Sequence, residues 1–128
     1  MAKITIPFVD LAGQFRNLES ELTKAFIDIG RSGVYIMGDR LEAFEVKAAK
    51  FCGLKHAIGV GHGSDALFLI LKALNIGPGD EVITVSHTAI ATVSAIESTG
   101  AIPVLTDINF ETFTIDPNKI VNLITPKT

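Results

Sequence analysis

The sequence predicts an α/β fold, in which a mainly parallel sheet is flanked by helices. From residue 57 onward, short apolar or β-branched runs alternate with segments whose apolar residues recur at helical spacing. Turns rich in glycine and proline separate these segments, as at 77–80. Such alternation is typical of parallel strands joined by right-handed helical crossovers.

The first 56 residues are expected to form an N-terminal arm and two helices. Residues 3–13 are expected to be extended. A helix over 14–29 follows from the spacing of its apolar residues, and 30–33 ends it. The next helix, 40–52, is expected to begin with a capping box of Asp39 and Glu42 and to stop at Gly53. We expect its single cysteine, Cys52, to be a buried structural thiol.

An apolar loop at 34–38 joins these two helices. Exposed apolar loops commonly belong to interfaces or binding sites. The alternative, that the loop packs on its own core, stays open from the spacing alone.

Residues 57–128 are expected to form a second region. Asp116 and Pro117 have the residue types of a helix cap and a first helical position. The predicted strands are 57–61, 81–86 and 102–107, and the predicted helices are 64–75, 88–99 and 117–124. The helix over 64–75 is apolar on nearly every side, so we expect other elements to cover it.

The turn at 59–65 is the main functional signal. A glycine-rich strand-to-helix turn exposes backbone N–H groups at a helix N-terminus, which favours an anion such as phosphate. The turn lacks the Gly-Lys-Ser/Thr ending of a P-loop and has G-x-G-x-G rather than the dinucleotide pattern G-x-G-x-x-G. A cofactor with one phosphate, such as pyridoxal phosphate, and a turn that binds nothing both stay open.

The composition excludes some classes of function. The 128 residues are 48% hydrophobic, with a net charge of -3 and scattered basic residues, which does not favour a nucleic-acid surface. No apolar run approaches the roughly 20 residues of a membrane span, so we expect no membrane partner. No signal core precedes the first helix, so we expect a cytoplasmic protein. We also expect no metal site. The surplus of apolar residues predicts surface covered by another chain or by further residues.

Six motifs in order resemble one family. They are PFVDL at 7–11, SGVYIMG at 32–38, FE at 44–45, GSDAL at 63–67, GPGDEVI at 77–83 and HTAIAT at 87–92. Together they resemble the DegT/DnrJ/EryC1/StrS aminotransferases, which use pyridoxal phosphate to act on nucleotide-linked keto sugars. The resemblance covers essentially the whole chain.

The resemblance implies the N-terminal part of a type I aminotransferase fold, with 57–128 as the first half of the large cofactor-binding domain. It implies a homodimer and glutamate as the amino donor. Gly63, Ser64 and Asp65 match the turn that holds the cofactor phosphate, with the Asp65 carboxylate expected to face away from it. His87 matches the segment that covers the pyridine ring; a histidine bonded to backbone is the alternative. Tyr35 matches the loop that approaches the partner's site.

The resemblance also implies that no catalytic residue lies in this chain. The lysine that forms the Schiff base and the aspartate that pairs with the pyridinium are expected beyond Thr128. Lys72 lies about 12 Å along the helix from Ser64, which is a poor position for this role. We therefore expect the chain alone to be inactive. A sugar dehydratase of the same family, with histidine in place of the lysine, and a non-catalytic fragment or interaction module remain as alternatives.

Overall fold

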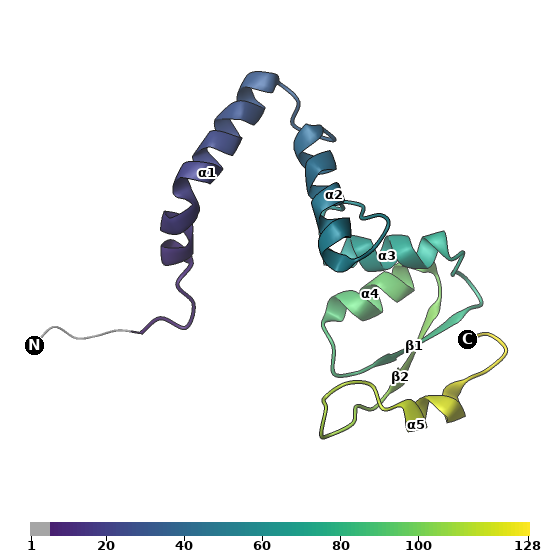
Figure 1. Cartoon of the computed structure of the whole chain (residues 1–128). Coiled ribbons are helices and arrows are strands. Elements are labelled where there is room, and N and C mark those ends of the chain that lie inside the picture. The colour runs from purple at the N-terminus through teal and green to yellow at the C-terminus, as the bar shows by residue number, and fades with distance from the viewer. Residues whose placement is uncertain (1–5) are drawn as a thin grey trace, which may run out of the picture. The chain divides into compact units, whose positions relative to one another are not determined.

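The structure, a computed structural model, describes residues 6–128 (Figure 1). The chain divides into two compact units, with the boundary in the sequence between Ile58 and Gly59, and each unit is described by itself. The first part of the predicted N-terminal arm, residues 3–5, lies outside the described residues. Residues 6–10 are not helical, whereas 11–13 are already part of the first helix, so the predicted arm is too long at its C-terminal end.

The first unit consists of two helices, α1 (Leu11–Ser32) and α2 (Asp39–Cys52), joined by a short loop. Helix α1 begins where the Asp10 carboxylate accepts a hydrogen bond from the backbone N–H of Gly13, at 2.8 Å. It ends at Gly33, whose left-handed backbone (φ 69°) favours glycine. The helix therefore runs three residues beyond the predicted end at 29, and it stops at the last residue of the predicted terminating segment 30–33.

The start of α2 differs from the prediction. Gly38 occupies the N-cap, and no side chain caps the helix. The predicted capping box is wrong because Asp39 is already a helical residue, so its carboxylate can favour the helix only through the dipole. Gly53 ends the helix as predicted, with φ 68°. Cys52 is exposed, which corrects the expectation of a buried thiol.

The second unit is a β-α-β arrangement with flanking helices. Its elements are α3 (Gly63–Ala73), β1 (Glu81–Val85), α4 (Ile90–Thr99), β2 (Ile102–Thr106), α5 (Pro117–Ile120) and the 3-10 turn Val121–Leu123. The two strands pair in parallel, with Glu81 opposite Ile102 and Val85 opposite Thr106. The α/β class and the parallel order of these strands are therefore confirmed.

One predicted strand is wrong. Among the described residues the sheet contains only β1 and β2, and the segment 57–61 lies outside it. Ile58 in this segment is 82% exposed. A strand requires a neighbour that completes its ladder of hydrogen bonds, and the apolar pattern of the segment supplies only the propensity.

The core of the second unit lies around the C-terminal half of α4, which packs against α3 and both strands (Figure 1). Ala95, Ile96 and Thr99 of α4 are buried. The Thr99 hydroxyl donates to the Ile96 carbonyl at 2.7 Å and accepts the N–H of Ala101 at 3.3 Å, so this buried polar group is satisfied.

Helix α3 is only partly covered. Phe68 and Leu71 lie on its less exposed side, whereas Ile70 and Leu74 are 58% and 65% exposed. The predicted cover over the apolar helix is therefore not provided by the described residues.

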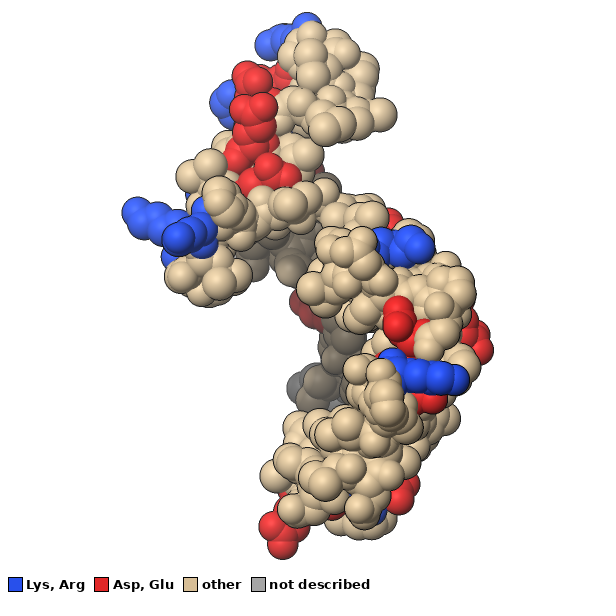
Figure 2. All heavy atoms as spheres, turned by 90° about the vertical axis from the view of Figure 1, so that its right-hand side faces the viewer, with Lys and Arg blue, Asp and Glu red and all other residues tan. Residues whose placement is uncertain are grey.

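Both signs of charge are scattered over the face drawn in Figure 2. None of the helices in the described part of the chain is long and apolar enough to cross a membrane.

Candidate functional site

The glycine-rich turn enters α3 through an unusual cap. His62 is the N-cap residue, and its Nδ1 accepts a hydrogen bond from the N–H of Asp65 at 3.2 Å. Its carbonyl accepts the N–H of Ala66, also at 3.2 Å. Within the described residues, the N–H groups of Gly63 and Ser64 have no hydrogen-bond partner. The N-terminus of α3 thus presents two open donors at the positive end of the helix dipole.

A shallow hollow of about 310 Å³ lies between α3 and α4 beside these donors. Its lining is Ser64, Asp65, Phe68, Ser94, Ala95 and Ser98. Sequence analysis missed Ser94 and Ser98. Their i,i+4 spacing indicates that they share one face of a helix, but nothing in the sequence indicates that this face lies beside Ser64.

The Asp65 carboxylate bends back over the turn. Its Oδ1 lies 3.5 Å from His62 Nε2, and its Oδ2 would lie 2.7 Å from any Cβ at position 61. A side chain at position 61 would therefore make the Asp65 carboxylate move. No side chain or backbone atom stands within 4 Å of a Cβ position at Gly63, so the turn is open there. That Asp65 faces away from a bound phosphate stays a prediction.

His87 lies in the loop after β1 and does not line the hollow beside Ser64. Its ring faces that of Phe113, with centroids 6.4 Å apart and planes tilted by 47°. This contact is an aromatic pair of ordinary geometry. The place of His87 beside a pyridine ring stays a prediction. Phe113 has φ 57°, which is rare for a bulky residue, and sequence analysis did not identify it.

The tight turn that carries Phe113 has its own supports. The Asn109 side chain accepts the N–H groups of Glu111 and Thr112 at 2.8 and 3.3 Å. An isolated antiparallel bridge between Ile108 and Ile115 closes the turn. The left-handed backbone at Phe113 therefore persists because the hydrogen bonds around it constrain the chain.

Tyr35 lies in the other unit, on the loop between α1 and α2, and is 73% exposed. Its relation to Ser64 and His87 stays a prediction.

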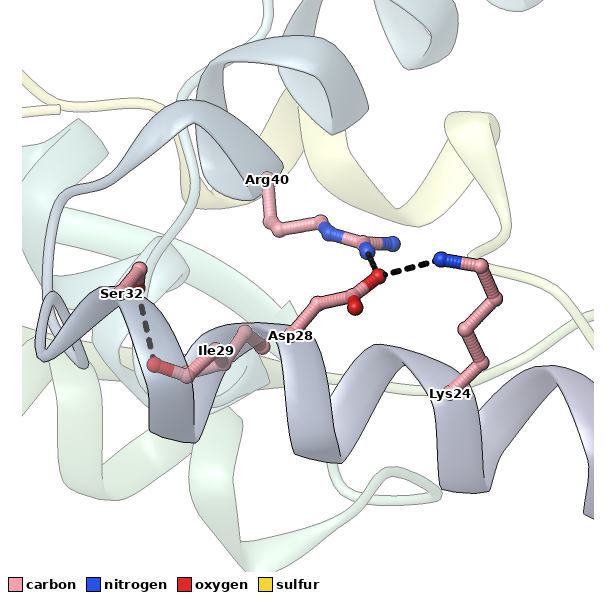
Figure 3. Close-up of polar contacts among 5 residues, drawn as sticks. All are labelled: Lys24, Asp28, Ile29, Ser32 and Arg40. Atoms are coloured by element: carbon pink, nitrogen blue, oxygen red, sulfur yellow. Dashed lines mark hydrogen bonds and ion pairs between the residues drawn. The ribbon is translucent and has the colours of Figure 1, made fainter.

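A cluster of charges lies close to this loop. The Asp28 carboxylate accepts hydrogen bonds from Lys24 Nζ at 2.7 Å and from the Arg40 guanidinium at 2.9 Å (Figure 3). The hydrogen bond from Lys24, with Arg40 adding to it, holds the pKa of the Asp28 carboxyl below its usual range. Sequence analysis missed this cluster, since only Lys24 and Asp28 are neighbours in helical spacing.

The parallel β-α-β unit places the chain in the class of α/β proteins, and an open helix N-terminus after a glycine-rich turn is a common anion-binding feature of that class. More specifically, the chain belongs to the DegT/DnrJ/EryC1/StrS aminotransferase family, whose family model matches residues 16–128.

Similar proteins include transaminases of nucleotide-linked sugars. The dTDP-3-amino-3,6-dideoxy-alpha-D-galactopyranose transaminase of Aneurinibacillus thermoaerophilus is 46% identical over 123 residues, which are 96% of this chain and 34% of that protein. The dTDP-3-amino-3,4,6-trideoxy-alpha-D-glucose transaminase of Streptomyces venezuelae is 44% identical, over 96% of this chain and 32% of its own length. The chain thus spans about a third of the length of these relatives.

Solved structures have the same fold. The S. venezuelae protein DesV in complex with a ketimine intermediate matches with a TM-score of 0.95 and 43% identity, over 98% of this chain and 34% of that one. NtdA of Bacillus subtilis with the bound cofactor PMP matches with a TM-score of 0.91 and 34% identity, over 99% of this chain and 30% of that one. The described fold is therefore that of the N-terminal part of these aminotransferases.

Proposed function

We propose that this chain is the N-terminal portion of a pyridoxal-phosphate-dependent aminotransferase that acts on a nucleotide-linked keto sugar, with glutamate as amino donor. The observation that carries the proposal is the open N-terminus of α3, with unpaired N–H groups at Gly63 and Ser64, in a chain that belongs to this family. The sugar transaminases among its relatives support the substrate class, and the PMP bound to NtdA supports the cofactor.

The residues present fit the phosphate of such a cofactor. The N–H groups of Gly63 and Ser64 and the Ser64 hydroxyl would hold the phosphate oxygens, and the dipole of α3 would add to the attraction. Asp65 belongs to the same turn, and His87 would form part of a wall beside the pyridine ring. The bound cofactor would supply an electron sink, while these side chains bind and orient it.

The reacting groups are proposed to come from outside residues 1–128. Lys72 is near the C-terminal end of α3, about 12 Å along the axis from Ser64, so it lies far from the open helix end. No other lysine among the described residues lies in the turn or lines the hollow beside it. On this proposal 57–128 is the first half of the cofactor-binding domain, the active form is a homodimer, and Tyr35 approaches the partner's site.

Binding of the cofactor to the chain tests the phosphate site directly. Titration with pyridoxal phosphate, followed through the backbone amide NMR signals, should move those of Gly63 and Ser64 first. Ser64→Glu should weaken binding at least tenfold, because a carboxylate would compete with the phosphate for the helix end. Ser20→Glu, an exposed serine on α1, is the matched control. Equal affinities of the two variants would place the cofactor elsewhere.

A further inference from the structure

Phe113 combines an exposed ring with a strained backbone. It is 63% exposed, and its φ of 57° is a left-handed conformation that glycine adopts without strain and a bulky residue rarely adopts. Burial of the ring therefore does not explain why phenylalanine rather than glycine occupies this position. A strained residue that packing does not require points to a role of its side chain.

The turn that carries Phe113 holds this conformation in place. The Phe113 N–H donates to the Asn109 carbonyl at 2.8 Å, and the Asn109 N–H donates to the Thr114 carbonyl at 2.8 Å. The Asn109 side chain also accepts the N–H groups of Glu111 and Thr112. Because these hydrogen bonds fix the backbone on both sides of Phe113, they also fix the direction in which its ring leaves the turn.

The partner of the Phe113 ring is the His87 imidazole. The distance of 6.4 Å between the two centroids lies within the range at which aromatic rings attract each other. His87 lies between β1, which ends at Val85, and α4, which begins at Ile90, so it belongs to neither element. The ring of Phe113 therefore restricts the orientations that are open to the imidazole.

Both rings lie at the carboxyl edge of the sheet. Strands β1 and β2 are parallel and end opposite each other at Val85 and Thr106, and His87 and the turn 108–115 follow these two ends. Helix α3 leads into β1 through the turn at 77–80, so its open N-terminus lies toward the same side of the unit (Figure 1). Ligands of α/β proteins bind outside the carboxyl ends of the strands.

We propose that Phe113 is a positioning residue that holds the His87 imidazole at this edge, in the orientation that covers the ring of the cofactor. The inference rests on the proposed function, in which His87 would form part of a wall beside the pyridine ring. Phe113 acts through His87 and has no contact with the phosphate site at Ser64. Its loss should therefore weaken binding of the cofactor's ring and leave binding of phosphate unchanged.

Two ligands separate these effects. Pyridoxine 5′-phosphate carries ring and phosphate but lacks the aldehyde that reacts with surface amines, whereas inorganic phosphate carries no ring. Phe113→Leu should weaken binding of pyridoxine 5′-phosphate about two- to tenfold, the range that corresponds to the energy of an aromatic pair. Binding of inorganic phosphate should not change. Phe110→Leu is the matched control, because Phe110 lies in the same turn and is 81% exposed. Phe113→Tyr, which keeps an aromatic ring, should restore the affinity.

The NMR signals of the carbon-bound protons of the His87 imidazole report the contact itself. Phe113→Leu should move these signals because the ring current of Phe113 is lost, whereas Phe110→Leu should leave them in place. Phe113→Gly should also move them, while its thermal unfolding midpoint stays equal or rises, because glycine relieves the strained backbone. A purely structural role of the ring would instead lower the midpoint.

Each outcome has one meaning. Unchanged His87 signals in Phe113→Leu would overturn the contact, and an unchanged ratio of the two affinities would overturn the positioning role. A lower midpoint of Phe113→Gly, with both ligands weakened alike, would make Phe113 a structural residue. If neither ligand binds the wild type, the proposed function fails, whereas the His87 signals still decide whether Phe113 holds the imidazole.

The wild type provides a test that needs no variant to fold. Pyridoxine 5′-phosphate should move the His87 signals and those of the Phe113 ring, whereas inorganic phosphate should move neither. Equal movement of these signals by the two ligands would contradict a place for His87 and Phe113 beside the ring of the cofactor.

Discussion

His62 caps α3 with an imidazole nitrogen, whereas asparagine is among the residue types most favoured at a helix N-cap. Either residue offers a side-chain acceptor for the N–H of Asp65. We expect His62→Ala to lower the free energy of unfolding by about 1 kcal/mol and His62→Asn to change it by only a few tenths. Urea unfolding of both variants checks this. Equal losses in the two variants would show that the side-chain acceptor for the Asp65 N–H is not what stabilises this helix end.

The lowered pKa of Asp28 makes the stability of the folded state depend on pH, and it fixes the sign of that dependence. The unfolded chain binds the proton at higher pH than the folded one, so the stabilisation is complete above the ordinary carboxyl value of about 3.9 and is lost as pH falls through the lowered pKa. The charged groups around it are Lys24 and Arg31 of α1 and Asp39 and Arg40 of α2.

Carboxyl ¹³C NMR of Asp28 should therefore titrate below the ordinary range, and it should move upward in Lys24→Gln, because the Lys24 hydrogen bond is the largest cause of the shift. An unchanged titration in that variant would assign the shift to another group.

At the level of elements, the junction of α4 and β2 depends on Gly100. Its φ is 89°, and a Cβ there would lie 2.8 Å from Pro78 Cγ. Gly100→Ala combines backbone strain with a collision, so we expect a loss of about 1–3 kcal/mol in the free energy of unfolding.

Gly30 is the matched control for this substitution. It lies inside α1 with open space around it, and Gly30→Ala should be neutral or stabilise by up to about 1 kcal/mol through helix propensity. Urea unfolding measures both variants. A loss in Gly100→Ala no larger than the effect of Gly30→Ala would contradict the role assigned to the Pro78 contact.

At the level of the whole molecule, the proposal that the reacting groups come from outside residues 1–128 predicts that no lysine of this chain forms a Schiff base with the cofactor. After incubation with pyridoxal phosphate and reduction by borohydride, peptide mass mapping should find no lysine labelled in stoichiometric amount among the eight in the chain. Sparse labelling of exposed amines is expected and carries no information. One lysine labelled to completion, together with amino transfer from glutamate to a keto sugar nucleotide, would overturn the proposal.

A protein of the length of the relatives, with these residues at its N-terminus, should both label one lysine and transfer the amino group. Cofactor binding without labelling would instead favour the dehydratase alternative, in which histidine replaces the lysine.

Local chemistry in the sequence determined much of the fold. Gly33 and Gly53 end their helices as predicted, and Asp116 caps α5 by accepting the N–H of Asn118 at 3.0 Å. The β-branched runs became the parallel strands β1 and β2. Such features depend on residues within one turn or one run, so the sequence alone contains their cause.

The tertiary structure decided everything that depends on a distant neighbour. The segment 57–61 has strand propensity but no place in the described sheet, because ladder hydrogen bonds require a partner. The glycine-rich turn was predictable, whereas Ser94 beside Ser64, and Phe113 against His87, follow from chain crossings that no local pattern encodes. Charge pairs across a loop and rings brought together by a turn are set by the path of the backbone, since side-chain contacts act over only a few ångströms.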